Sequence, residues 1–183
     1  MSIESIINNT IGKEAGYVNH PSDRGGETIW GITIAVAREN GYNGPMKEMP
    51  REVAKDIYWK KYLVKPGFDK VMVISEKIAE KLFDTGVNMG TDYPRRWLQQ
   101  WLNALNRQGK DYPDIIEDGL IGPATLKALK ALLDFRGKVK GEEVMLKGLN
   151  CSQGSRYLEL SRNRSANEDF VFGWLANRVG LQC

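Results

Sequence analysis

Apolar residues recur at helical spacing along most of this chain, and one glycine-rich segment interrupts them. Between residues 3 and 14, isoleucines occupy positions 3, 6, 7 and 11, which share one face of an amphipathic helix. Similar stripes continue to the C-terminus: Val53, Ile57, Tyr58 and Tyr62; Ile78, Leu82, Phe83 and Val87; Trp97, Leu98, Trp101, Leu102 and Leu105; Leu126, Leu129, Leu132 and Leu133; Met145, Leu149, Tyr157 and Leu160; Phe170, Val171, Trp174 and Leu175. The pattern predicts a mainly α protein.

Local residues predict where some of these helices begin and end. Gly12 weakens the end of the first helix and Gly16 ends it, so Glu14 is expected in its last turn. Ser75 can cap a helix, because its hydroxyl can accept a hydrogen bond from a free backbone N–H. Pro123 suits the first turn of another helix.

Residues 17–33 interrupt the helical pattern. They begin with the turn-forming residues Asn19, His20, Pro21, Ser22, Asp23, Gly25 and Gly26, and end with the β-prone run Thr28-Ile29-Trp30-Gly31-Ile32-Thr33. This order predicts an extended loop that leads into a short strand or hairpin. A second loop, over residues 107–119, is the best candidate for a boundary between lobes.

Length and charge limit the possible functions. The 183 residues suffice for one domain, or for one domain with a small second lobe. With 26 Lys and Arg against 23 Asp and Glu, the net charge is +3, and both signs are interspersed along the chain. We therefore expect no nucleic-acid partner, whereas a weak positive field suits an anionic polymer such as a cell wall.

The scarcity of cysteine and histidine argues against metal chemistry. Cys151 and Cys183 are the two cysteines, too few for a disulfide scaffold, and we expect free thiols. His20 is the single histidine, and no zinc-ligand spacing is present. We therefore expect no metal and no cofactor.

The N-terminus lacks the basic leader and apolar core of a secretory signal. No run reaches the roughly 18 apolar residues that span a bilayer. We expect a chain made in the cytoplasm without a signal peptide and without stable membrane insertion.

The segment from Lys13 to Thr33 carries the residues best suited to catalysis. Cleavage of a glycosidic bond needs an acid to protonate the leaving oxygen, and commonly a second carboxylate. Glu14, at a helix end beside the apolar Tyr17 and Trp30, can remain protonated, while Asp23 in a polar turn stays ionised. Thr28 could hold the attacking water through its hydroxyl. These residues predict Glu14, Asp23 and Thr28 as the catalytic set.

Each of these residues also has an ordinary structural interpretation. A glutamate near a helix end is usually solvated, and an aspartate before Gly25-Gly26 usually shapes a turn. A lone histidine such as His20 more often packs or forms a hydrogen bond than catalyses. From residue chemistry alone, a hydrolase site is one possibility among these.

A longer pattern favours the hydrolase. It comprises Glu14, Gly16, Tyr17, Val18, Asn19, Pro21, Asp23, Gly25, Gly26, Thr28, Gly31, Ile32 and Thr33. In this order the residues resemble the signature of glycoside hydrolase family 108, the N-acetylmuramidases of bacteriophages and bacteria. The chain departs from it at Ala15, where the family usually has glycine.

The resemblance implies that Glu14 is the essential general acid, with Asp23 and Thr28 as its partners. Their order is also similar to that of phage lysozymes that cut between a helix and a β-hairpin, which implies a lysozyme-like α-helical fold with a small hairpin near residues 17–33. The residues expected to contact substrate are Tyr17, Asn19, His20, Trp30 and Asn88.

A second resemblance lies downstream. Residues 83–90, 97–103 and 118–126 are similar to the predicted peptidoglycan-binding region that usually accompanies this family. We therefore expect a catalytic region over residues 1–92 and a helical binding lobe over 93–183, packed together as one globular unit. The helix that begins at Pro123 could bind acetamido or carboxylate groups at its N-terminus, or residues 118–123 could simply start a helix. Likewise, Trp97 and Trp101 at helical spacing more often belong to a core than to a sugar platform.

The function that these resemblances imply is that of a monomeric endolysin. It would hydrolyse the β-1,4 bond between N-acetylmuramic acid and N-acetylglucosamine in peptidoglycan glycan strands, acting in the periplasm after membrane permeabilisation and lysing the host cell. The alternatives are a non-catalytic peptidoglycan-binding adaptor, an enzyme acting on chitin or chitosan, and a secreted or secretion-associated bacterial cell-wall hydrolase. Whether hydrolysis inverts or retains the anomeric configuration depends on the separation of the carboxyl groups.

Overall fold

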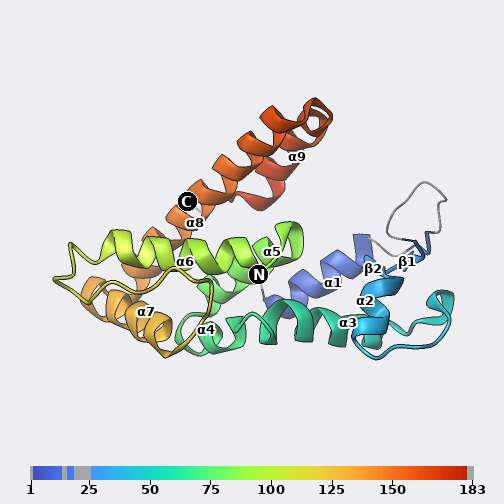
Figure 1. Ribbon diagram of the computed structural model, residues 1–183, viewed down its shortest axis with the longest axis horizontal. Coiled ribbons are helices and arrows are strands. Elements are labelled where there is room, and N and C mark those ends of the chain that lie inside the picture. The colour runs from blue at the N-terminus through green and yellow to red at the C-terminus, as the bar shows by residue number, and fades with distance from the viewer. Residues whose placement is uncertain (1, 14–15, 19–25, 181–183) are drawn as a thin grey trace. The chain divides into compact units, whose positions relative to one another are not determined.

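The structure is a computed structural model that describes residues 2–13, 16–18 and 26–180 (Figure 1). The chain divides into two compact units, Met1–Lys65 and Pro66–Cys183. Among the described residues, no helix is long and apolar enough to cross a membrane. The predicted mainly α, lysozyme-like class with one small hairpin is confirmed.

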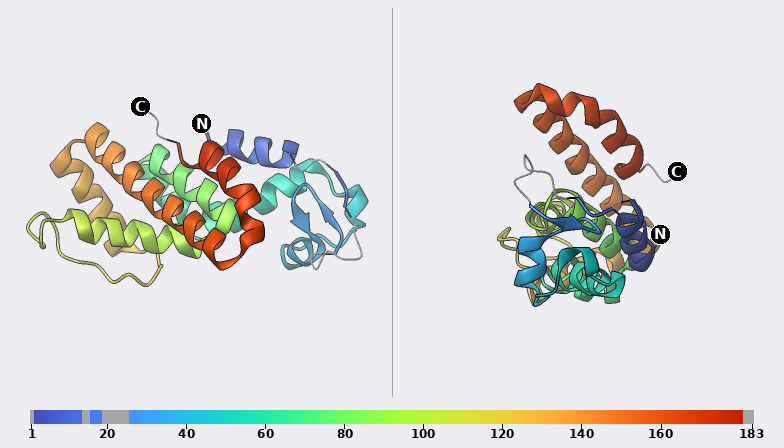
Figure 2. Two further views of the ribbon diagram at one scale, coloured as in Figure 1. Left: turned by 90° about the horizontal axis from the view of Figure 1, so that it is seen from above. Right: turned by 90° about the vertical axis from the view of Figure 1, so that its right-hand side faces the viewer.

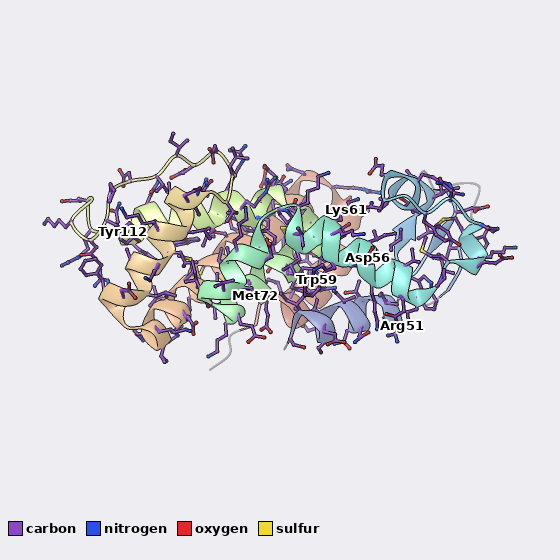
Figure 3. All side chains as sticks on the ribbon, turned by 90° about the horizontal axis from the view of Figure 1, so that it is seen from below. Arg51, Asp56, Trp59, Lys61, Met72 and Tyr112 are labelled. Carbon is purple, nitrogen blue, oxygen red and sulfur yellow. The ribbon has the colours of Figure 1, made fainter. Side chains whose placement is uncertain are left out.

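The first unit contains the hairpin and short helices. Its elements are α1 (Ile3–Lys13), β1 (Thr28–Ile29), β2 (Ile32–Thr33), α2 (Ile34–Glu39), the 3₁₀ helix η1 (Met46–Glu48), α3 (Arg51–Tyr58) and the π-helix η2 (Trp59–Val64). The isoleucines of α1 are all buried, which confirms the predicted amphipathic helix. α1 packs against α3. Arg51 lies at the start of α3 (Figure 3) and donates a hydrogen bond to Asn8 at 3.1 Å.

The second unit is built from longer helices. Its elements are α4 (Phe68–Ile74), α5 (Glu76–Met89), α6 (Asp92–Leu105), α7 (Pro123–Arg136), α8 (Lys138–Asn163), the 3₁₀ helix η3 (Ser165–Asn167) and α9 (Glu168–Arg178). The 26-residue helix α8 contacts α5, α6, α7 and α9 (Figure 2). Leu82, Leu98, Leu102 and Leu129 are fully buried at its core. The unit is therefore organised around α8.

The predicted helix starts are confirmed. The Ser75 hydroxyl oxygen accepts a hydrogen bond from the N–H of Ile78 at 3.3 Å, and Pro123 occupies the first position of α7. The Ser75 hydroxyl also donates to the buried Glu142 carboxylate of α8 at 2.7 Å. The residue that caps α5 thus also fastens it to the central helix.

One buried side chain holds the C-terminal end of the loop between α6 and α7. The Gln99 amide nitrogen donates to Asp118 Oδ1 at 2.9 Å and to the Leu120 carbonyl at 3.0 Å, while its oxygen accepts from the Gly119 N–H at 2.7 Å. The loop lies inside the second unit and not between the two units. That residues 1–92 catalyse and residues 93–183 bind peptidoglycan stays a prediction.

Candidate active site

The hairpin has the tight turn that its sequence favours. Thr28 pairs with Thr33 and Ile29 with Ile32 in antiparallel register. The two residues between the strands, Trp30 (φ 56°) and Gly31 (φ 73°), both have positive φ, as a two-residue type I′ turn requires. The hairpin predicted in residues 17–33 is therefore present at its C-terminal end.

Trp30 is an unusual residue for that turn, because a bulky side chain disfavours positive φ. Two hydrogen bonds hold it there. Its indole Nε1 donates to the Met49 carbonyl at 2.9 Å, and its own carbonyl accepts from the Tyr58 hydroxyl at 3.2 Å. The hairpin tip is thereby fastened to the end of η1 and to α3. The expected contact of Trp30 with substrate stays a prediction.

A second pair of hydrogen bonds joins the hairpin to the chain that precedes it. Val18 donates to the Thr28 carbonyl and Thr28 donates to the Val18 carbonyl, each at 2.8 Å. The Thr28 hydroxyl donates to the Gly26 carbonyl at 3.3 Å, and its oxygen can still accept a hydrogen bond. The backbone thus fixes Thr28, while its hydroxyl can still act as an acceptor.

Tyr17 is attached to the same short helix as Trp30. The Lys47 ammonium of η1 lies 4.9 Å from the centre of the Tyr17 ring, a cation–π arrangement. Since Trp30 bonds to Met49 immediately after η1, both aromatic residues that were predicted beside the acid converge on this helix.

The other predicted residues of the first unit lie outside the described part of the chain. These are Glu14, Asn19, His20 and Asp23. Glu14 follows Lys13, the last residue of α1. Their catalytic and binding roles stay predictions.

Asn88 lies in the second unit, on α5. Its side-chain oxygen accepts from the Tyr157 hydroxyl at 2.6 Å, and that hydroxyl accepts from the Gln153 amide at 3.0 Å. Tyr157 and Gln153 are both buried residues of α8. Asn88 therefore links α5 to α8, and its expected contact with substrate stays a prediction.

The structure also reveals a groove that the sequence did not predict. Leu98 and Leu102 of the α6 stripe are fully buried as expected, but Trp97 and Trp101 are half-buried and line an open groove of about 390 Å³ with Tyr93. The spacing of these aromatic residues, four apart on one helix, was the available indication.

Metal ligands do not gather in the described part of the chain: no group of three His, Cys, Asp or Glu side chains there is placed to hold an ion. Cys151 is an exposed free thiol, as expected, and Cys183 lies outside the described residues.

The chain is similar to known protein families and to a solved structure. Residues 7–90 match the family Glycosyl hydrolase 108, and residues 93–179 match the Predicted Peptidoglycan domain. The fold is similar to that in the structure of Brucella abortus SagA, with a TM-score of 0.63 and 23% sequence identity over 96% of this chain and 88% of that one. No curated protein matches the sequence.

The helix, the anchored hairpin and the two matched regions define a lysozyme-like glycoside hydrolase that degrades peptidoglycan. The first part of the chain thus carries a region that matches glycosyl hydrolase family 108, and the second part carries a predicted peptidoglycan domain.

Proposed function

We propose that the chain is an endolysin-type N-acetylmuramidase that cleaves the β-1,4 bond between N-acetylmuramic acid and N-acetylglucosamine, with Glu14 as general acid. The observation that carries the proposal is the hairpin bonded to Val18, within the region that matches the hydrolase family. Only three residues lie between Glu14 and Val18, so their Cα atoms are at most about 14 Å apart. This covalent limit supports a site that includes both Glu14 and Thr28.

In this mechanism Glu14 protonates the leaving glycosidic oxygen as the bond breaks. Asp23 stabilises the oxocarbenium-like transition state or orients water, and Thr28 accepts a hydrogen bond from that water. Tyr17 and Trp30 supply apolar surface that favours the protonated form of Glu14. Asn19, His20 and Asn88 complete the expected substrate contacts.

The decisive variant is Glu14→Gln, because glutamine keeps the size of the side chain but cannot deliver a proton. We expect turnover of purified peptidoglycan to fall by about 10²- to 10⁴-fold, with an unchanged circular dichroism spectrum. Glu4→Gln is the matched control, since Glu4 is an exposed carboxylate on α1. Lysis at the wild-type rate by folded Glu14→Gln protein would refute the assignment.

Mass spectrometry of the released fragments identifies the bond. A muramidase leaves reducing N-acetylmuramic acid ends. Reducing N-acetylglucosamine ends would indicate a glucosaminidase, anhydro-muramic ends a lytic transglycosylase, and free stem peptides an amidase or peptidase. A parallel assay on chitin and chitosan tests the other polysaccharide substrates.

The roles of Asp23 and Thr28 are tested by Asp23→Ala and by two substitutions of threonine. Thr28→Ser keeps the hydroxyl and Thr28→Val keeps the β-branched shape, while neither alters the backbone bonds to Val18. We expect Ser to retain activity and Val to lose it. Near-normal turnover in Asp23→Ala and Thr28→Val would reduce the site to Glu14. We favour inversion, with the carboxyl groups about 6.5–9.5 Å apart so that water fits between them.

We further propose that the enzyme is a phage product that acts as a monomer on periplasmic peptidoglycan after membrane permeabilisation, without a nucleic-acid partner. Expression in a Gram-negative host should cause lysis only when the inner membrane is damaged, and light scattering should give the mass of one chain. Lysis by expression alone would contradict this route. A holin gene beside the coding gene would support a phage origin, and a secretion cluster would support a bacterial effector.

A further inference from the structure

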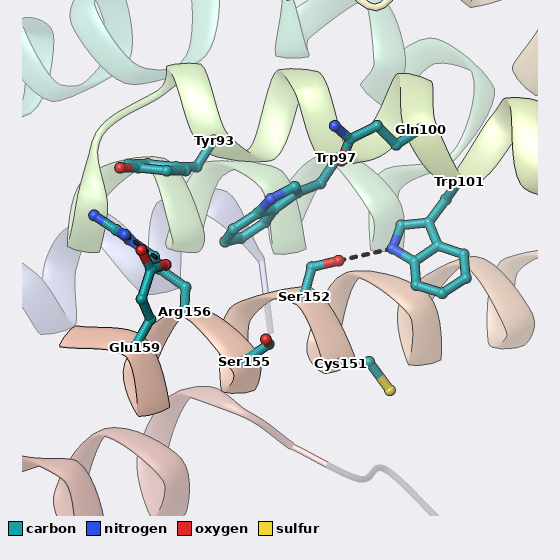
Figure 4. Close-up of a pocket in the computed structure, with 9 residues that line it drawn as sticks. All are labelled: Tyr93, Trp97, Gln100, Trp101, Cys151, Ser152, Ser155, Arg156 and Glu159. Atoms are coloured by element: carbon teal, nitrogen blue, oxygen red, sulfur yellow. Dashed lines mark hydrogen bonds and ion pairs between the residues drawn. The ribbon is translucent and has the colours of Figure 1, made fainter. Parts of the chain in front are cut away.

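The groove in the second unit lies between α6 and α8. Tyr93, Trp97 and Trp101 come from α6, four residues apart and therefore on one face of the helix. Ser152, Ser155, Arg156 and Glu159 line the opposite side from α8 (Figure 4). Aromatic side chains thus form one wall, and small or polar side chains form the other.

The two tryptophans play different parts in this groove. The Trp101 indole donates to the Ser152 hydroxyl at 2.9 Å and packs so closely on α8 that a Cβ added at Gly148 would lie 2.6 Å from its ring. Trp101 is therefore part of the helix packing. Trp97 is half-buried, and within the described part of the chain no group accepts a hydrogen bond from its indole N–H.

The groove stays open because of what α8 places opposite these rings. Its side chains there are Cys151, Ser152 and Ser155, which are too short to cover the neighbouring aromatic surface. At about 390 Å³ the groove is within the usual size of small-ligand sites. It can hold one or two sugar rings and not a long polymer segment.

The charged end of the groove is internally neutralised. Arg156 lies 4.8 Å from the centre of the Tyr93 ring and forms an ion pair with Glu159 at 2.7 Å. A carboxylate ligand would meet the glutamate as well as the arginine, so the pair does not favour an anion. It offers both donors and acceptors, which suits hydroxyl and acetamido groups.

We propose that this groove binds one or two N-acetylated sugars of the glycan strand, with the apolar face of a ring stacked on Trp97. The proposal rests on the proposed function, because it supplies the strand that the hydrolase cuts. Aromatic rings contribute large, rigid and partly polar contact surfaces, and Ser155, Arg156 and Glu159 hydrogen-bond the polar edge of the sugar.

The test uses the full chain carrying Glu14→Gln, so that the ligand is not cleaved. Peptide-free glycan strands and tetra-N-acetylchitotetraose are titrated while the indole N–H signals are followed by NMR. We expect the Trp97 signal to shift with ligand concentration, and Trp97→Ala to weaken binding by at least about tenfold, as for a central aromatic anchor. Free stem peptide should not shift it.

Two further variants make the result specific. Ser155→Met fills the groove from the exposed α8 side without removing an aromatic ring, and it should weaken binding as Trp97→Ala does. Phe172→Ala removes an aromatic side chain that is 85% exposed on α9 and outside the groove, and it should bind like the parent.

The outcomes separate this proposal from the proposed function. Unchanged glycan affinity in both groove variants, or a Trp97 shift caused by stem peptide alone, overturns the groove and leaves the muramidase assignment intact. Hydrolysis that survives Glu14→Gln overturns the catalytic assignment, and the groove is then judged from the titration with tetra-N-acetylchitotetraose, which lacks N-acetylmuramic acid.

Discussion

Gly148→Ala places a methyl group where α8 meets the Trp101 ring. The added Cβ would lie 2.6, 2.8 and 3.1 Å from three carbons of the indole. All three distances are shorter than the optimal separation of about 3.5–4.0 Å between non-bonded carbon atoms. The ring cannot turn away freely, because its Nε1 is bonded to Ser152. Either Trp101 or α8 must move.

The size of the effect follows from two opposing contributions. Overpacking of this kind costs about 1–3 kcal/mol, while replacing a glycine inside a helix by alanine stabilises by about 0.5–1 kcal/mol. We expect Gly148→Ala to lower the free energy of unfolding by about 1–2 kcal/mol. At this chain length each kcal/mol corresponds to about 2–4 °C in the thermal midpoint.

Gly154→Ala is the matched control in the same helix. A Cβ at Gly154 would meet only Leu175 Cδ2, at 3.8 Å, an ordinary contact distance. The same substitution should therefore stabilise the protein by about 0.5–1 kcal/mol. Urea unfolding followed by circular dichroism should separate the two variants by about 1.5–3 kcal/mol in opposite directions. If Gly148→Ala stabilises as Gly154→Ala does, the close packing of Trp101 on α8 is refuted.

Three further variants test other contacts. Gln99→Ala leaves the Gly119 N–H without its acceptor, and with the other lost loop bonds it should cost about 2–4 kcal/mol in urea unfolding. Tyr58→Phe removes the hydrogen bond to the Trp30 carbonyl and should cost about 1 kcal/mol in the same assay. Burial lowers the pKa of Lys81 to about 8, so between pH 8 and 10 the unfolded chain binds a proton that the folded chain does not. Stability of the wild type relative to Lys81→Gln should therefore rise by about 2 kcal/mol over that interval.

A specific result would contradict each of these three predictions. Stability of Gln99→Ala equal to that of Gln100→Ala, its exposed neighbour, would show that the loop holds itself. A larger loss of stability in Tyr62→Phe than in Tyr58→Phe would show that the Tyr58 hydroxyl does not anchor the hairpin. A difference between wild type and Lys81→Gln that stays constant or falls from pH 8 to 10 would contradict burial of the ammonium group.

The local sequence determined the elements of this protein. Isoleucine spacing predicted α1, Ser75 predicted the start of α5, and Pro123 predicted the start of α7, all of which the structure confirms. The turn-forming and β-prone residues predicted the hairpin that ends at Thr33. These predictions succeed because capping, periodicity and turn geometry depend on residues within a few positions of one another.

Only the tertiary structure decided which faces remain open. Periodicity places Trp97 and Trp101 on one stripe with Leu98, but their exposure depends on the short side chains of α8 about 50 residues later. In the same way, the positive φ of Trp30 depends on hydrogen bonds to Met49 and Tyr58. Contacts between residues so distant in sequence leave no local pattern, because the free energy that maintains them comes from packing after the chain has folded.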